Sequence, residues 1–207
     1  MSCIIGLDAS LTKMGYCLLD ADTKEVRVKK IGCYTTDMMG LVRLDRVMGA
    51  LDDIVAKESL VLCCSEEYAY NPFGSTSIYQ IGEAIGQVKL WFYRKKIPML
   101  RVQPTTLKLF ATGTGRAQKI DIIRAVNSRY GLGLEDGTRE IPQELLKRKG
   151  RKQYYPAEDD KADAFVQALV GRMFYRVWTK KDELKKYEDR ERDIYTRVLL
   201  TAKEFFL

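Results

Sequence analysis

Five carboxylates stand at positions where their side chains could do chemistry. Asp8 ends one apolar run, Glu66 and Glu67 end a second, and Asp160 and Asp163 begin an amphipathic stretch. The two aspartates are three residues apart, so both project from one face of a helix. Each carboxylate alone could cap a turn or complement a helix dipole. Their joint placement instead indicates one acidic cluster.

The composition limits the chemistry that such a cluster could perform. The sequence contains no histidine, which excludes Ser-His-Asp and Cys-His nucleophile systems and histidine-containing zinc sites. Strand ends in α/β sheets open into the usual site crevice, and clustered carboxylate oxygens suit Mg²⁺ or Mn²⁺. Two such ions about 4 Å apart would activate a water and stabilise a leaving 3′-oxygen in phosphodiester hydrolysis.

Basic residues indicate an acidic partner. Lysine and arginine number 35 against 28 aspartates and glutamates, a formal net charge of +7. Cation runs with aromatics nearby suit phosphate contact and base stacking, although a charge run is often only a solvated loop. Five cations lie within six residues, followed by two tyrosines: Lys147, Arg148, Lys149, Arg151 and Lys152.

The hydrophobic pattern predicts an α/β domain with a mixed sheet. Apolar or alternating runs predict strands at 3–8, 14–20, 25–34, 60–67 and 97–102, the first three joined as an antiparallel meander. Three- and four-residue spacing predicts helices at 38–57, 76–95, 117–130 and 159–178. We expect one domain over residues 1–178, with a basic loop at 131–157. The charged extension at 179–207 predicts a helix that packs on a neighbour or on a second subunit.

Two further patterns concern the compartment. No window approaches 18 uncharged apolar residues, so we expect no membrane span. Five cysteines with no C-x-x-C pair and no export signal predict reduced thiols in the cytoplasm.

Four motifs in order resemble a known family. Residues 5–16 read IGLDASLTKMGY, residues 64–70 read CSEEYAY, residues 113–119 read GTGRAQK and residues 160–164 read DKADA. With these motifs the chain resembles the RuvC-type Holliday junction resolvases of the RNase H-like and retroviral-integrase superfamily. The Ser-Leu-Thr form of the first motif is most similar to phage-type members, which would place the protein in the host cell cytoplasm.

The resemblance implies a fold, an activity and partners. It implies an RNase H-like fold with a mixed five-stranded sheet, three strands antiparallel and the others parallel, flanked by helices. It implies a homodimer that binds branched DNA, above all four-way junctions, with the helix of Gly82 and Gly86 at the dimer interface. Each subunit would nick one of two symmetric strands, with Mg²⁺ or Mn²⁺ and two ions in each active site.

Site residues follow position by position from the resemblance. Lys108 and Lys119 would contact the scissile or a neighbouring phosphate, and Tyr70 would stack at the opened junction centre. Only one of the adjacent glutamates can join Asp8, since neighbouring strand residues face opposite sides. We select Glu67, which has Tyr70 three residues later and a spacing to residues 81–82 that fits the family, and Glu66 is the alternative. The metal ligands would then be Asp8, Glu67, Asp160 and Asp163.

Departures from the family pattern leave other functions open. The first motif lacks the usual Pro-Gly after Asp8, and the loop between Lys119 and Asp160 is longer than in typical bacterial members. This variant could therefore cut branched DNA more broadly than a strict four-way resolvase. An actin-like nucleotide-binding ATPase shares a similar first motif, although that fold needs two such domains. A non-catalytic junction-binding protein is the third hypothesis.

Overall fold

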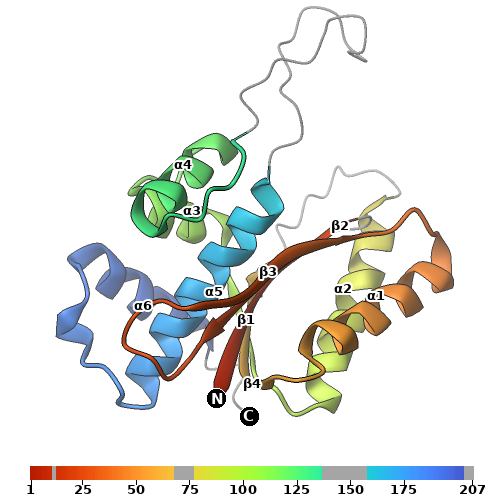
Figure 1. Ribbon diagram of the computed structural model, residues 1–207, viewed down its shortest axis with the longest axis horizontal. Coiled ribbons are helices and arrows are strands. Elements are labelled where there is room, and N and C mark those ends of the chain that lie inside the picture. Colours follow the sequence, from red (N-terminus) through yellow and green to blue (C-terminus); the bar gives the residue numbers. More distant parts are fainter. Residues whose placement is uncertain (11–12, 68–76, 137–157, 203–207) are drawn as a thin grey trace, which may run out of the picture.

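The computed structural model describes residues 1–10, 13–67, 77–136 and 158–202 of the chain. Its centre is a β-sheet (Figure 1). The sheet has five strands in the order β3-β2-β1-β4-β5. Strand β1 pairs antiparallel with β2, which pairs antiparallel with β3, whereas β1–β4 and β4–β5 are parallel pairs. The predicted mixed sheet is therefore confirmed. The strands are β1 (Ser2–Ala9), β2 (Lys13–Asp20), β3 (Val28–Thr35), β4 (Ser59–Glu66) and β5 (Met99–Val102).

Helices cover both faces of the sheet (Figure 1). Helices α1 (Gly40–Val55) and α2 (Ser77–Arg94) pack on one face. The opposite face carries α5 (Asp159–Trp178), which lies against β1, β2 and β4. Around α5 lie α3 (Pro104–Thr112), α4 (Lys119–Tyr130), a 3-10 helix (Leu184–Lys186) and α6 (Asp189–Ala202). Among the described helices, none is long and apolar enough to cross a membrane.

Strand β1 is buried on both sides, and its alternation divides the core in two. Ile4 belongs to the apolar cluster beneath α5, whereas Ile5 and Leu7 belong to the cluster beneath α1 and α2. The same alternation runs along β4, where Leu62 and Cys64 face α5. Because successive strand residues point to opposite faces, this parity decides which side chains at the strand ends reach α5.

Helix α3 is the element that the hydrophobic pattern did not predict. It has nine residues, too few for a periodic signal to stand out. Its ends follow local rules, because Pro104 begins it and Gly113 ends it with φ of +83°. The other helices lie within two residues of the predicted bounds up to Trp178, and Gly131 ends α4 in the left-handed region as expected.

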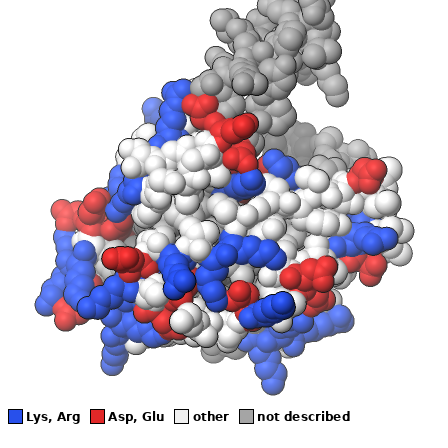
Figure 2. Space-filling view, viewed as in Figure 1, with Lys and Arg blue, Asp and Glu red and all other residues white. Residues whose placement is uncertain are grey.

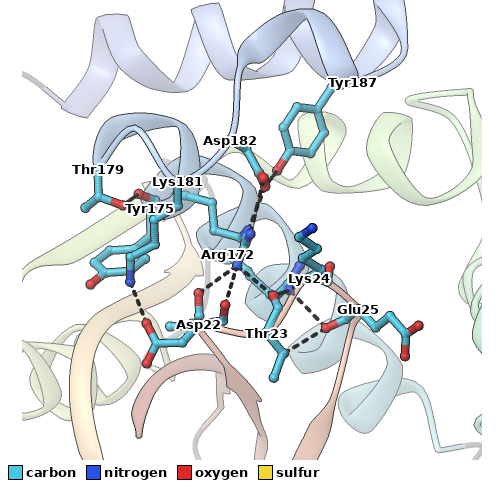
Figure 3. Close-up of polar contacts among 12 residues, drawn as sticks. Asp22, Thr23, Lys24, Glu25, Arg172, Tyr175, Thr179, Lys181, Asp182 and Tyr187 are labelled. Carbon is cyan, nitrogen blue, oxygen red and sulfur yellow. Dashed lines mark hydrogen bonds and ion pairs between the residues drawn. The ribbon is translucent and has the colours of Figure 1, made fainter.

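Two arginines of α5 hold the turn between β2 and β3, and Figure 3 shows Arg172 beside this turn. Arg172 donates hydrogen bonds to the carbonyls of Asp20 (2.9 Å), Thr23 and Glu25 (2.9 Å). Arg176 donates to the carbonyls of Asp22 (3.1 Å) and Thr23 (2.6 Å), and its Nε lies 2.6 Å from Oδ2 of Asp182. Both arginines are buried. They therefore satisfy backbone carbonyls that the tight turn leaves without strand partners.

The C-terminal extension packs on its own chain. Ile194, Tyr195 and Val198 of α6 are buried in the cluster beneath α5, and α6 contacts α3, α5 and β5. Arg129 of α4 also forms an ion pair of 3.2 Å with the buried Glu191. The extension therefore supports the helices beside the sheet, and the domain boundary at residue 178 stays a prediction.

Candidate active site

The carboxyl ends of β1 and β4 bring two carboxylates together. The parallel register pairs Gly6 with Cys64 and Leu7 with Ser65, so Asp8 and Glu66 are the next residues of the two strands. By the alternation of β1 and β4, both belong to the face that α5 covers. Asp163 lies in the first turns of α5. Its negative charge interacts with those of both Asp8 and Glu66. The structure therefore brings Asp8, Glu66 and Asp163 near one another.

Two glycines let α5 lie close enough to the sheet to join this cluster. A Cβ added at Gly6 would overlap the carbonyl oxygen of Ala164 and lie 2.9 Å from Cβ of Ala168. A Cβ added at Gly15 would overlap the carbonyl of Asp160. Any side chain at these two positions would push the N-terminal half of α5, with its aspartates, away from β1.

We expect Gly6→Ala to destabilise the fold strongly. Overpacking between backbones cannot be relieved by a rotamer change, so the free energy of unfolding should fall by about 3 kcal/mol or more. Urea denaturation followed by circular dichroism measures this. Gly49→Ala is the matched control, because Gly49 lies in α1 with no atom within 4 Å of an added Cβ. The control should gain up to about 1 kcal/mol from helix propensity, and equal stability of both variants would contradict the close packing of α5.

The carboxylates of the cluster have raised pKa values. Burial raises the pKa of Asp8 to about 7, and the negative charges of Asp163 and Asp160 add to the effect. Burial also raises the pKa of Asp163 to about 7, against the opposing charge of Lys119. Burial and the charge of Asp8 raise the pKa of Glu66. These carboxylates repel one another, so a cation between them would be stabilised.

Lysines already neutralise the outer edge of the cluster. Lys119, the first residue of α4, forms an ion pair with Asp159, and Lys13, the first residue of β2, forms one with Asp160. Burial alone would lower the pKa of Lys119, but its hydrogen bond to Asp159 and the nearby aspartates raise it overall. The charges of Lys108 of α3 and of Lys119 oppose the rise in the pKa of Glu66. Figure 2 shows acidic side chains gathered at the N-terminal end of α5, with basic side chains at their border.

The structure places Glu67, the glutamate selected from the sequence, on the other face of the sheet from Asp8. Glu67 has the parity of Cys63, which faces α1 and α2, and its Oε1 lies 3.9 Å from Nη1 of Arg101 on that side. Its charge acts on Lys89 of α2. Glu66 is therefore the glutamate beside Asp8, and the adjacent residue forms an ion pair on the opposite face of the sheet.

Other predicted residues fall in different places. Lys108 is half-buried in α3, and Lys119 is exposed, with 66% of its side chain accessible.

Among the described residues, no three acidic or cysteine groups lie as close together as ligands of one ion. All five cysteines are free. Tyr70 and the basic run lie outside the described residues: Lys147, Arg148, Lys149, Arg151 and Lys152.

Asp159 and Lys13 are the site residues that sequence reasoning missed. Asp159 directly precedes Asp160, but its own partner, Lys119, is 40 residues away. Lys13 stands inside the first motif, five residues after Asp8, where only its charge distinguished it. Both depend on contacts between β2, α4 and α5 that no local pattern encodes.

A mixed sheet of this order, flanked by helices, is the RNase H-like fold. The family model "Crossover junction endodeoxyribonuclease RuvC" matches residues 4–136. The chain therefore belongs to the RuvC family of crossover junction endodeoxyribonucleases. Members of this family are metal-dependent nucleases.

Curated relatives and solved structures agree with this assignment. The RuvC protein of Prochlorococcus marinus strain MIT 9303 is 24% identical over 171 residues, which cover 81% of this chain and 96% of the relative. RuvC of Synechococcus strain CC9605 is 27% identical over 169 residues, with the same shares of the two chains.

Thermus thermophilus RuvC in complex with a Holliday junction superposes with a TM-score of 0.60 and 16% identity, over 86% of this chain and 96% of that one. The yeast mitochondrial Holliday junction resolvase Ydc2 gives 0.53 and 12%, over 99% of this chain and 84% of that one. At these identities, the two structures show a common fold.

Proposed function

We propose that this protein resolves four-way or other branched DNA junctions by paired, metal-dependent phosphodiester hydrolysis. The observation that carries this proposal is the convergence of Asp8, Glu66, Asp160 and Asp163 from two strand ends and one helix, with lysines at the border. Each hydrolysis breaks the bond from phosphorus to the 3′-oxygen and leaves a 5′-phosphate and a 3′-hydroxyl.

The donor set fits a hard divalent ion, Mg²⁺ or Mn²⁺, and we propose two ions in each site. All four donors are carboxylates, the ligands that these ions prefer. The raised pKa values of Asp8 and Asp163 result from burial and from repulsion that a cation would relieve. When bound, the ions supply an activated water and neutralise charge on the phosphate. Glu66 replaces Glu67 in this ligand set.

The chain's own cations would hold the DNA. Lys119 and Lys108 flank the cluster and would contact the scissile or a neighbouring phosphate. We retain as proposals that Tyr70 stacks on a base at the junction centre and that the five cations at 147–152 contact the DNA backbone. Action on DNA is also consistent with the cytoplasmic location that we expect from the sequence.

A homodimer would place two such sites on one junction. Most of the exposed large apolar side chains lie in the layer of α1 and α2, including Leu41 (77% exposed), Tyr79 (82%) and Tyr93 (79%). Gly82 and Gly86 on α2 have no atom within 4 Å of an added Cβ. An apolar, uncovered face of this kind suits a second copy of the chain.

A cleavage assay tests the proposed activity. We expect symmetric paired nicks in a labelled four-way junction with Mg²⁺ or Mn²⁺, none with EDTA, and little cutting of a plain duplex. Asp163→Asn should reduce the cleavage rate by about a thousandfold, because several kcal/mol of transition-state stabilisation is lost, while the variant still binds the junction in Ca²⁺.

Alternative outcomes of the assay separate the competing functions. Binding without cutting in either ion would favour the junction-binding hypothesis. Single unpaired nicks would contradict the homodimer. Undiminished cutting by Asp163→Asn would exclude this acidic cluster as the active site.

A further inference from the structure

The backbone of Lys13 is held at the border of the active site by hydrogen bonds with Ser10. The Ser10 amide donates to the carbonyl of Lys13 at 2.9 Å, and the Ser10 hydroxyl donates to the same carbonyl at 2.6 Å. The Lys13 amide in turn donates to the Ser10 hydroxyl at 3.2 Å. Ser10 therefore fixes the backbone from which the Lys13 side chain extends.

The ammonium of Lys13 is directed at one carboxylate. It forms an ion pair with Oδ2 of Asp160, and the two side chains are only 30% and 15% exposed. Gly15, two residues further along the same face of β2, lies against the backbone of Asp160. The strand and the helix are thus in direct contact here, and the ion pair is partly shielded from water.

This ion pair distinguishes Asp160 from its neighbours. Asp8 and Asp163 are buried among like charges, and no lysine among the described residues forms an ion pair with either of them. The negative charge of Asp160 is instead neutralised by a side chain of its own protein. A cation that uses Asp160 as a ligand must compete with Lys13 for the same carboxylate.

We propose that Lys13 is the counter-ion of Asp160 in the metal-free site and that a divalent ion displaces its ammonium group when the metal binds. Lys13 thereby sets the affinity of the site for the metal. This inference rests on the metal site of the proposed function. Lys13 is a positioning residue, because an ammonium cannot ligate a metal ion.

The proposal predicts effects of opposite sign for Lys13→Met. Without metal, the variant should unfold at a lower temperature, because Asp160 loses its partner among other carboxylates. The dissociation constant for Mn²⁺ should nevertheless fall by about three- to fivefold at low salt, the size expected for a partly exposed ion pair. A purely structural role would weaken both folding and metal binding.

The experiment combines calorimetric titration with Mn²⁺ and thermal unfolding in EDTA. Lys13→Arg keeps the charge and should bind Mn²⁺ as the wild type does. Lys161→Met is the matched control, because Lys161 forms a similarly exposed ion pair with Glu158, which is not a proposed ligand. Its dissociation constant should be unchanged. Lys13→Thr, a residue suited to strands, serves as the second neutral variant if Lys13→Met does not fold.

The outcomes separate this inference from the proposed function. Saturable Mn²⁺ binding by the wild type, with equal or weaker binding by the neutral variants, overturns the role of Lys13 alone. If the wild type shows no saturable Mn²⁺ binding, the metal site of the proposed function is contradicted, and so is the role of Lys13.

Discussion

Glu66→Gln should abolish DNA cleavage, whereas Glu67→Gln should leave it nearly intact. Glu66 shares its face with Asp8 and the start of α5, and the charge of Asp8 raises its pKa together with burial. Loss of one carboxylate ligand removes several kcal/mol of transition-state stabilisation, so the rate should fall by about a thousandfold. Glu67 is directed toward Arg101, and its loss should change the rate by no more than about threefold, the scale of a partly exposed ion pair.

The two glutamates are adjacent, which makes each variant the control for the other. Single-turnover cleavage of a four-way junction in Mg²⁺ measures the chemical step without product release. Junction binding in Ca²⁺ should survive in both variants. A large loss with Glu67→Gln and a small loss with Glu66→Gln would reverse the assignment and return it to the choice made from the sequence.

Arg176→Met should destabilise the protein by about 3–5 kcal/mol, the cost of breaking a buried charge pair by removing one partner. Arg176 is 4% exposed and donates to the carbonyls of Ala21, Asp22 and Thr23 and to the carboxylate of Asp182. Methionine preserves the volume but donates no hydrogen bond to any of these four acceptors. The cost should therefore exceed that of any surface ion pair.

Arg197→Met provides the comparison. Arg197 lies 2.7 Å from Asp193 on the exposed side of α6, with both side chains more than half exposed. Its replacement should change the free energy of unfolding by about 0.5 kcal/mol or less. Urea denaturation measures both variants, and a similar small change in both would show that the turn between β2 and β3 does not depend on Arg176.

The same contact predicts a dependence of stability on pH. The hydrogen bond from Arg176 lowers the pKa of Asp182 from 3.8 to about 2. Because the folded pKa is the lower one, the stabilisation is complete above the unfolded value near pH 4 and is lost as the pH falls toward 2. The loss amounts to about 2 kcal/mol. It should be absent in Asp182→Asn, and a parallel fall of both proteins between pH 4 and 2 would contradict this contribution.

Much of this protein could be read from its sequence. The change of apolar period along the chain predicted the five strands and the helix that begins at Asp159, because burial imposes a period of two on strands and 3.6 on helices. Asp8 stood out as a charge at the end of an apolar run, and Asp163 as a charge at the start of an amphipathic stretch. These features are local, so composition and spacing record them.

Only the tertiary structure decided between Glu66 and Glu67. Because side chains alternate along a strand, adjacent residues face opposite sides of the sheet. The packing of α5 decides which of the two sides holds the site. Similarly, Lys13 has no distinctive neighbours in sequence, and it reaches Asp160 because Gly6 and Gly15 let the helix lie against β1 and β2. Contacts between residues 147 positions apart depend on the packing of whole elements, which no short segment of the chain specifies.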